Sequence, residues 1–285
     1  MIDSLIARLP QPIIVATDTV FGVAAPATKE GISFLYNIKH RPSTQPLPIM
    51  VSSFEEAESL VRIPQAVKPF LQQVWPGPFT FVAESLSKEL SDIMSTPTLG
   101  VRVPGHPELK KLLATYQNPL AVTSANISGQ LTVSHEDHLS ESIKASALYI
   151  QKQSCTYGIE STVALWSNNA WEVLRLGALS LQTLLAHAPT HYQPPAPKGW
   201  CEVEPFNNQS FYVSFGDSLS PWNLSPTSSM AEACQNLYPI LHALSKEKAQ
   251  YISVGPLPDH PLRSSVYDAL LRAVAPRDGL EPPTK

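Results

Sequence analysis

Pro12-Ile13-Ile14-Val15-Ala16-Thr17-Asp18-Thr19-Val20-Phe21-Gly22-Val23 opens the regular pattern of this chain. Its apolar, β-branched residues predict a β segment that is interrupted by the polar insert Thr17-Asp18-Thr19. A helix is predicted over 28–39 because Thr28 suits the N-cap and an acidic residue follows in the first turn. Strand-like and helix-like segments alternate through the first two-thirds of the chain, but the strands near 161–166 and 171–174 follow each other directly. The pattern therefore predicts an α/β fold with a mixed sheet, not a regular doubly wound one.

The other segments of this region follow from apolar periodicity and from the prolines at their ends. The predicted helices are 54–61, 65–74, 107–116, 135–146 and 180–187. The predicted strands are 47–51, 79–83, 100–104, 120–123 and 147–150.

Proline marks the domain organisation, since the chain has 28 prolines and only 12 glycines. Pro194-Pro195-Ala196-Pro197 is a stiff, extended segment, and we interpret 189–205 as an interdomain linker. A β-α-β-α pattern follows, with strands at 210–215 and 251–254 and helices at 230–244 and 261–274. This pattern predicts a small Rossmann-like α/β domain over 206–285, in addition to a larger domain over 1–188.

Composition excludes several classes of protein. The net charge is -4, and no region is basic enough to make nucleic-acid binding the main task, so we expect direct RNA binding to be weak or absent. No apolar run approaches the ~20 residues of a membrane span, and Met1 to Leu5 does not begin a signal peptide. The three cysteines lack metal-binding spacing, and Cys155 is expected to be an inert thiol. We therefore expect a cytoplasmic protein with no membrane partner and no metal site.

Lys39-His40-Arg41-Pro42-Ser43-Thr44 stands out in a chain with 15% charged residues. Two cations and two hydroxyls at the junction of a helix and a strand suit an anion such as a nucleotide phosphate. The alternative is a solvated helix C-terminus, where cations favour the helix dipole. Arg102 and Arg175 also lie at strand ends, where α/β proteins build ligand sites, and a salt bridge to a carboxylate is the alternative for each.

Motifs of other nucleotide-binding and hydrolytic sites are missing. The chain has neither a G-x-x-x-x-G-K-[ST] loop nor a G-x-G-x-x-G sequence, so neither a P-loop nor a standard dinucleotide site is supported. The spacing around Ser161 does not match a G-x-S-x-G nucleophile elbow.

Seven ordered motifs resemble those of the YrdC family of threonylcarbamoyl-AMP synthases, in its two-domain form. They run from about Pro12 to Leu185, and the C-terminal region resembles the additional domain of that family more loosely. The motifs are Ala16-Thr17-Asp18-Thr19-Val20-Phe21-Gly22, Lys39-His40-Arg41-Pro42 with Gln45-Pro46-Leu47, Trp75-Pro76-Gly77-Pro78-Phe79-Thr80, Val101-Arg102-Val103-Pro104, Ser124-Ala125-Asn126-Ile127-Ser128-Gly129, Gly158-Ile159-Glu160-Ser161-Thr162-Val163 and Arg175-Leu176-Gly177.

The resemblance implies a YrdC-like catalytic domain whose twisted mixed sheet encloses a concave, basic cavity. It implies formation of threonylcarbamoyl-AMP and pyrophosphate from L-threonine, bicarbonate and ATP, for the threonylcarbamoyl-adenosine modification of tRNA. ATP would enter with Mg²⁺ as a substrate, without a tightly bound prosthetic group, and the product would pass to a tRNA threonylcarbamoyl transferase. The implied catalytic residues are Lys39 and Arg41. The implied ATP ligands are Lys39, Arg41, Asn126, Ser134 and Arg175, and the implied threonine ligands are Thr19, Arg102, Ser124 and Ser161.

Two alternatives remain open from the sequence. One is a non-catalytic nucleotide- or RNA-binding relative that has kept the cavity, and Met50 favours it because a thioether cannot donate a hydrogen bond. The other is a related carbamoyl-adenylate enzyme, although the chain has no acylphosphatase-like or zinc-finger segment before the motifs.

Overall fold

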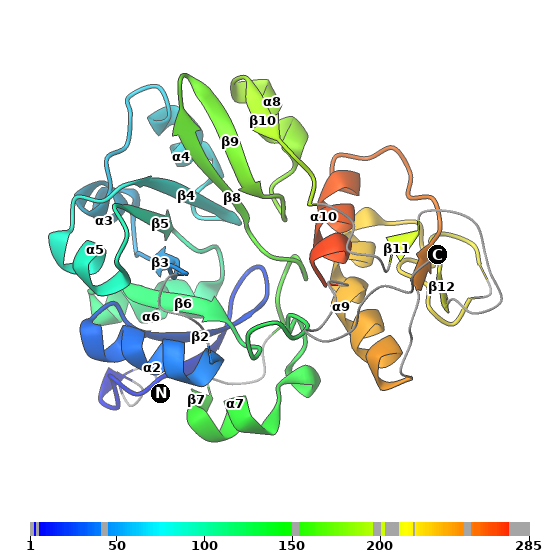
Figure 1. The fold of residues 1–285 in the computed structure, drawn as a ribbon, viewed down its shortest axis with the longest axis horizontal. Helices are drawn as coiled ribbons and strands as arrows, with labels where there is room; N and C mark the ends of the chain where they lie inside the picture. Colours follow the sequence, from blue (N-terminus) through cyan, green and yellow to red (C-terminus); the bar gives the residue numbers. More distant parts are fainter. Residues whose placement is uncertain are drawn as a thin grey trace, which may run out of the picture.

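The first strands of the chain form a hairpin at one end of a large sheet (Figure 1). In the computed structural model, which describes residues 3, 6–40, 45–149, 154–195, 201–202, 211–218, 220–247 and 252–273, β1 (Ile13–Ala16) pairs antiparallel with β2 (Phe21–Pro26). The predicted polar insert is the connection between them. The Thr17 hydroxyl donates to Val20 O at 2.7 Å and accepts from the backbone amides of Thr19 and Val20, which fixes the turn.

The large sheet has ten strands in the order β10-β9-β8-β4-β5-β3-β6-β2-β1-β7, with parallel and antiparallel neighbours. The predicted mixed sheet is therefore confirmed. Its other strands are β3 (Ile49–Met50), β4 (Phe79–Glu84), β5 (Thr98–Arg102), β6 (Leu120–Ser124), β7 (Leu148–Tyr149), β8 (Thr162–Ser167), β9 (Ala170–Arg175) and β10 (Thr190–Tyr192).

Helices accompany this sheet at nearly the predicted positions. They are α2 (Lys29–Lys39), α3 (Phe54–Leu60), α4 (Lys68–Val74), α5 (Lys88–Met94), α6 (Pro107–Tyr116), α7 (Glu141–Ser146) and α8 (Leu181–His187), with a short 3-10 helix η1 (Glu136–His138). Thr28 caps α2, since its hydroxyl accepts from Gly31 N at 3.3 Å, as predicted. The helix α5 was not predicted from the sequence.

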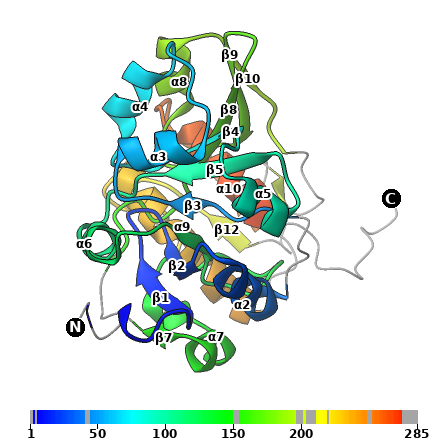
Figure 2. The same ribbon diagram turned by 90° about the vertical axis from the view of Figure 1, so that its left-hand side faces the viewer.

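The two faces of the sheet differ because side chains alternate along a strand. On one face Phe79 and Phe81 of β4 pack with Trp171 of β9, at ring-centroid distances of 5.6 and 6.1 Å. Helices α2, α3, α4, α5, α7 and α8 contribute to this main core, and Figure 2 shows several of them beside the strands. A smaller core on the other face packs around α6. The main core thus covers one face, and part of the opposite face is left for a cavity.

A second, three-stranded parallel sheet has the order β11-β13-β12. Its strands are β11 (Cys201–Glu202), β12 (Phe211–Val213) and β13 (Ile252–Val254), and its helices are α9 (Met230–Lys246) and α10 (Arg263–Ala273). The helix α9 connects two adjacent parallel strands, so β12, α9 and β13 form a βαβ unit. Figure 1 shows α9 and α10 between the large sheet and the strands β11 and β12 of the small sheet.

The apolar core of this C-terminal unit includes residues from the large domain. Val20, Ile159 and Ala178 belong to the same buried cluster as α9 and α10. The segment expected to be a linker, 189–205, begins with β10 of the large sheet and includes β11 of the small one, and its residues 196–200 and 203–205 lie outside the described part of the chain. The domain boundaries remain a prediction. Within the described ranges, none of the helices is both long and apolar enough to cross a membrane.

Two histidines stack across the contact between the domains. The rings of His138 in η1 and His242 in α9 are 4.3 Å apart with an interplanar angle of 11°, and His242 Nε2 donates to Thr132 O at 3.0 Å. His138 Nδ1 is buried and has no hydrogen-bond partner among the described residues. Burial, followed by the charges of His242, His135 and Lys246, lowers the pKa of His138 from 6.5 to about 4, and Asp137 opposes this shift.

We expect the free energy of unfolding to fall as the pH is lowered from 6.5 towards about 4. In this range the unfolded chain binds a proton at His138 and the folded protein does not, so acid favours unfolding; above pH 6.5 this contribution vanishes. Urea unfolding at several pH values should show a smaller acid loss in His138→Phe, which keeps an aromatic ring against His242. An identical pH dependence in the variant would contradict this account.

Candidate active site

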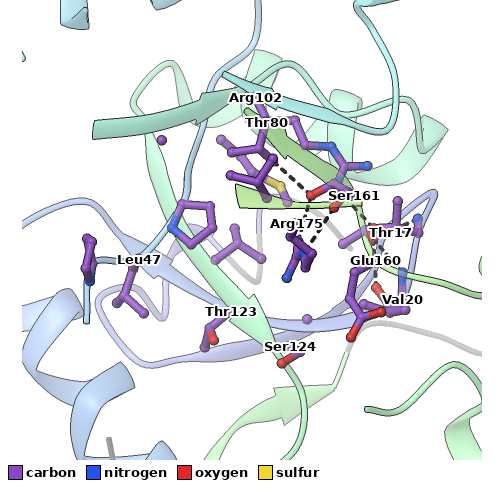
Figure 3. Close-up of a pocket in the computed structure, with 18 of the residues that line it drawn as sticks. Thr17, Val20, Leu47, Thr80, Arg102, Thr123, Ser124, Glu160, Ser161 and Arg175 are labelled. Carbon is purple, nitrogen blue, oxygen red and sulfur yellow. Dashed lines mark hydrogen bonds between the residues drawn. The ribbon is translucent and has the colours of Figure 1, made fainter. Parts of the chain in front are cut away.

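A cavity of about 350 Å³ opens on the sheet face opposite the main core (Figure 3). Thr80 and Val82 of β4 line it, and they alternate with the core residues Phe79 and Phe81 of the same strand. Strand β5 follows the same rule, since Arg102 lines the cavity and Val101 packs in the core. The cavity wall is thus fixed by the strand period of the central sheet.

Arg102 is the most deeply buried cation of the cavity wall, with 2% of its surface exposed. Its Nη2 forms an ion pair with Asp18 Oδ1 at 2.6 Å, its Nη1 donates to Thr19 Oγ1 at 3.1 Å, and its Nε donates to a backbone carbonyl, that of Gly77, at 2.8 Å. The salt bridge weighed as an alternative therefore exists. A guanidinium has five N–H donors, so two remain for a ligand after these three bonds among the described residues.

Arg175 and Ser161 form a second polar group on the wall. Arg175 Nη2 donates to Ser161 Oγ at 2.9 Å and its Nε donates to Ser161 O at 3.0 Å, whereas Thr80 Oγ1 lies 2.9 Å from Ser161 Oγ. Burial lowers the pKa of the Arg175 guanidinium, and the nearby Glu160 carboxylate opposes that shift. A half-buried cation whose hydrogen-bond partners among the described residues are all neutral is suited to an anionic ligand.

Lys39 supports the wall from behind. It is 2% exposed, and its Nζ donates to Ser124 O at 2.6 Å, to Ser124 Oγ at 3.3 Å and to Asn126 Oδ1 at 3.0 Å. The alternative of a solvated helix end is therefore wrong for Lys39. Ser124 lines the cavity, but Lys39 and Asn126 are not among the lining residues.

The residues expected to bind ligands are brought together in part. All four expected threonine ligands, Thr19, Arg102, Ser124 and Ser161, line the cavity together with Arg175. Lys39 and Asn126 reach it through Ser124. Ser134 is buried, its Oγ has no partner among the described residues, and it is not on the cavity wall. Arg41 lies outside the described residues.

Sequence reasoning missed Thr80 and Glu160 as cavity residues. The alternation of Phe79, Thr80 and Phe81 carried a signal for Thr80, because one polar residue between two aromatic core residues faces the other side of a strand. Glu160 gave no such signal, since its partners come from distant parts of the chain.

Two chemistries can be assessed from side chains near the cavity. Cys155 is buried, as predicted, and burial raises the pKa of its thiol to about 12, which disfavours the reactive thiolate. In the described part of the chain, no group of three or more His, Cys, Asp or Glu side chains could hold a metal ion. The arrangement is suited to binding anions and aligning them.

The fold is that of the two-domain α/β proteins represented by Sua5. The structure of Pyrococcus abyssi Sua5 complexed with L-threonine matches with a TM-score of 0.81 and 22% identity, over 95% of this chain and 92% of that chain. At this level of identity, the similarity shows a common fold of both domains.

The family follows from sequence. The Sua5_yciO_yrdC family, described as "Telomere recombination", matches residues 8–177, and this chain belongs to that family. A Pyrococcus abyssi protein named threonylcarbamoyl-AMP synthase is 32% identical over 174 residues, which are 59% of this chain but only about half (51%) of that protein. A Bacillus subtilis protein of the same name is 24% identical over 306 residues, covering 92% of this chain and 88% of that protein.

We expect Asp18→Asn to lower the free energy of unfolding by about 3 kcal/mol, because it leaves the buried Arg102 charge unpaired. Glu84→Gln is a matched control, since Glu84 pairs with Arg62 at the same 2.6 Å while both side chains are more than 60% exposed. The control should change stability much less, because water screens an exposed ion pair. Urea unfolding measures both, and equal losses would show that the Arg102 pair contributes no more than a surface pair.

Proposed function

We propose that this chain is an L-threonylcarbamoyladenylate synthase, a nucleotidyltransferase that serves the threonylcarbamoyl-adenosine modification of tRNA. L-threonine, bicarbonate and ATP are converted to threonylcarbamoyl-AMP, pyrophosphate and water. The threonine nitrogen captures the bicarbonate carbon as a carbamate with loss of water. A carbamate oxygen then bonds to the α-phosphorus of ATP, and the bond from that phosphorus to the pyrophosphate oxygen breaks.

The observation that carries the proposal is the joint presence of Arg102, Arg175, Thr19, Ser124 and Ser161 on one cavity wall in a member of this family. Arg102 has two N–H donors left after its internal bonds, the number needed for a bidentate grip on a carboxylate. Its fixed position would orient threonine by its carboxylate and leave the amine free to react.

Charge neutralisation is the second part of the mechanism. The substrates bring a carboxylate, a carbamate and a triphosphate into one cavity, so their mutual repulsion must be offset before the carbamate can approach phosphorus. Arg175 lies on the wall and Lys39 stands behind Ser124, while Arg41 is assigned to the same triphosphate by its motif. Catalysis then rests on orientation and positive charge, without a protein nucleophile.

The proposed reaction also has consequences for the metal ion, for the ATP ligands and for the fate of the product. Mg²⁺ accompanies ATP as part of the substrate and needs few protein ligands, and the reaction requires no tightly bound prosthetic group. Asn126 is assigned to the ATP side with Lys39, its hydrogen-bond partner. The acyl-adenylate product is reactive, so it suits direct hand-off to a tRNA threonylcarbamoyl transferase in the cytoplasm.

We expect the purified protein to release pyrophosphate and form threonylcarbamoyl-AMP only when threonine, bicarbonate and ATP are all present. Mass spectrometry of the adenylate and a pyrophosphate assay measure the two products. Omission of each substrate in turn is the control. Binding of nucleotide or RNA without threonine-dependent formation of the adenylate would contradict the proposal and favour a non-catalytic relative.

Ser161→Ala should raise the KM for threonine about tenfold, the effect of losing one hydrogen bond of about 1.4 kcal/mol. The substitution removes the hydroxyl that contacts Thr80 and Arg175, at a position that directly precedes strand β8. Steady-state kinetics with each substrate varied would measure the change. An unaltered threonine KM would remove Ser161 from the threonine site.

A further inference from the structure

The C-terminal unit reaches a cavity residue of the large domain through one hydrogen bond. Tyr238 of α9 is 2% exposed, and its hydroxyl donates to Glu160 Oε2 at 2.7 Å. The other oxygen of the same carboxylate, Oε1, accepts from the Thr132 hydroxyl at 2.7 Å. Both oxygens of Glu160 are therefore held by donors, and one of the donors belongs to the second domain.

The backbone around Glu160 is fixed on both sides. A Cβ atom at Gly158 would lie 2.5 Å from Gln235 Cα of α9, so this glycine lets the helix approach closely. A Cβ atom at Gly177 would lie 2.1 Å from Glu160 O, and Ala178 N donates to the same oxygen at 2.8 Å. The orientation of the Glu160 side chain then depends on its two hydroxyl donors.

The charge of Glu160 matters because its neighbour in sequence, Ser161, is the hydrogen-bond partner of Arg175. Glu160 and Arg175 both line the cavity, as Figure 3 shows, and the negative charge of Glu160 opposes the lowering of the Arg175 pKa by burial. A carboxylate oxygen without a donor would pair with this guanidinium. Such a pair would occupy the cation that the triphosphate needs.

The Tyr238 hydroxyl stays protonated and can therefore donate to the Glu160 carboxylate. Burial, followed by the Glu160 charge, raises the pKa of Tyr238 well above 10, so the phenol keeps its proton at neutral pH.

We propose that Tyr238 is a positioning residue of the active site: its hydroxyl holds the Glu160 carboxylate in an orientation that leaves Arg175 free for the anionic nucleotide. The inference rests on the proposed function, because it assigns Arg175 to ATP. The second domain thereby sets the strength of ATP binding through one hydroxyl, although none of its described residues lines the cavity.

The test compares Tyr238→Phe with Gln235→Ala on the same helix. Gln235 Nε2 donates across the same interface to Thr156 O at 2.9 Å, but Thr156 does not line the cavity. Tyr238→Phe should raise the KM and the calorimetric Kd for ATP about tenfold, with kcat and the threonine KM within about twofold of the wild type. Gln235→Ala should leave all of these values unchanged.

Adding Glu160→Gln to Tyr238→Phe removes the competing negative charge. The double variant should recover ATP binding to within about threefold of the wild type, a rescue that a purely structural role of Tyr238 would not produce. If Tyr238→Phe does not fold, Thr132→Val removes the other donor to Glu160 and should weaken ATP binding in the same direction.

Two results would overturn the inference: equal ATP binding by Tyr238→Phe and Gln235→Ala, or a loss of binding that Glu160→Gln does not rescue. Failure of the proposed function is a separate outcome. If the wild type forms no threonylcarbamoyl-AMP, the function is wrong, whereas the ratio of calorimetric Kd values for ATP still decides the role of Tyr238.

Discussion

The buried ion pair between Arg102 and Asp18 is the constraint on which the rest of the cavity depends. Arg102 ends a strand in the middle of the large sheet, and Asp18 lies in the turn between β1 and β2. Because an unpaired buried charge is strongly unfavourable, the hairpin turn must stay against β5. The same guanidinium also holds Thr19 of this turn and the carbonyl of Gly77, so the motif that contains Gly77 is tied to it as well. One charge therefore joins three separate segments into one wall.

The alternation of side chains along each strand then separates the residues that pack in the core from those that line the cavity. Aromatic and aliphatic residues of β4, β5 and β8 face the main core, and their neighbours in sequence face the cavity. A register shift of one residue would exchange these sets and bury the polar ones in the core, so the packing that stabilises the sheet also fixes the cavity wall. Fold and site thus depend on the same alternation, although different residues serve each.

Local sequence signals predicted much of the fold, but they did not predict which distant residues contact one another. Thr28, a capping threonine, and the proline that begins α6 placed two helices within a residue of their observed bounds. Strands β10 and β11 were missed because both lie in the segment 189–205, whose prolines indicated an extended linker. The sequence motifs identified Arg102 and Arg175 as candidate site residues, but they could not show that Lys39 lies behind Ser124. The contact of Glu160 with α9 was equally hidden, since its donor is 78 residues away.

The motif that contains Gly158 and Ser161 explains how the second domain and the cavity share one segment. Successive residues of this segment face different partners: Gly158 admits α9, Ile159 joins the core of the C-terminal unit, Glu160 meets Tyr238, and Ser161 meets Arg175. A rigid-body shift of α9 would therefore disturb the first three contacts, whereas the contact between Ser161 and Arg175 lies within the large domain. A change confined to the Tyr238 hydroxyl would alter only the charge balance beside Arg175. Contact between the domains stabilises the segment through packing at Gly158 and Ile159. The effect of Tyr238 on a bound anion is electrostatic, because it acts through the Glu160 carboxylate. The two effects are separable because they depend on different atoms.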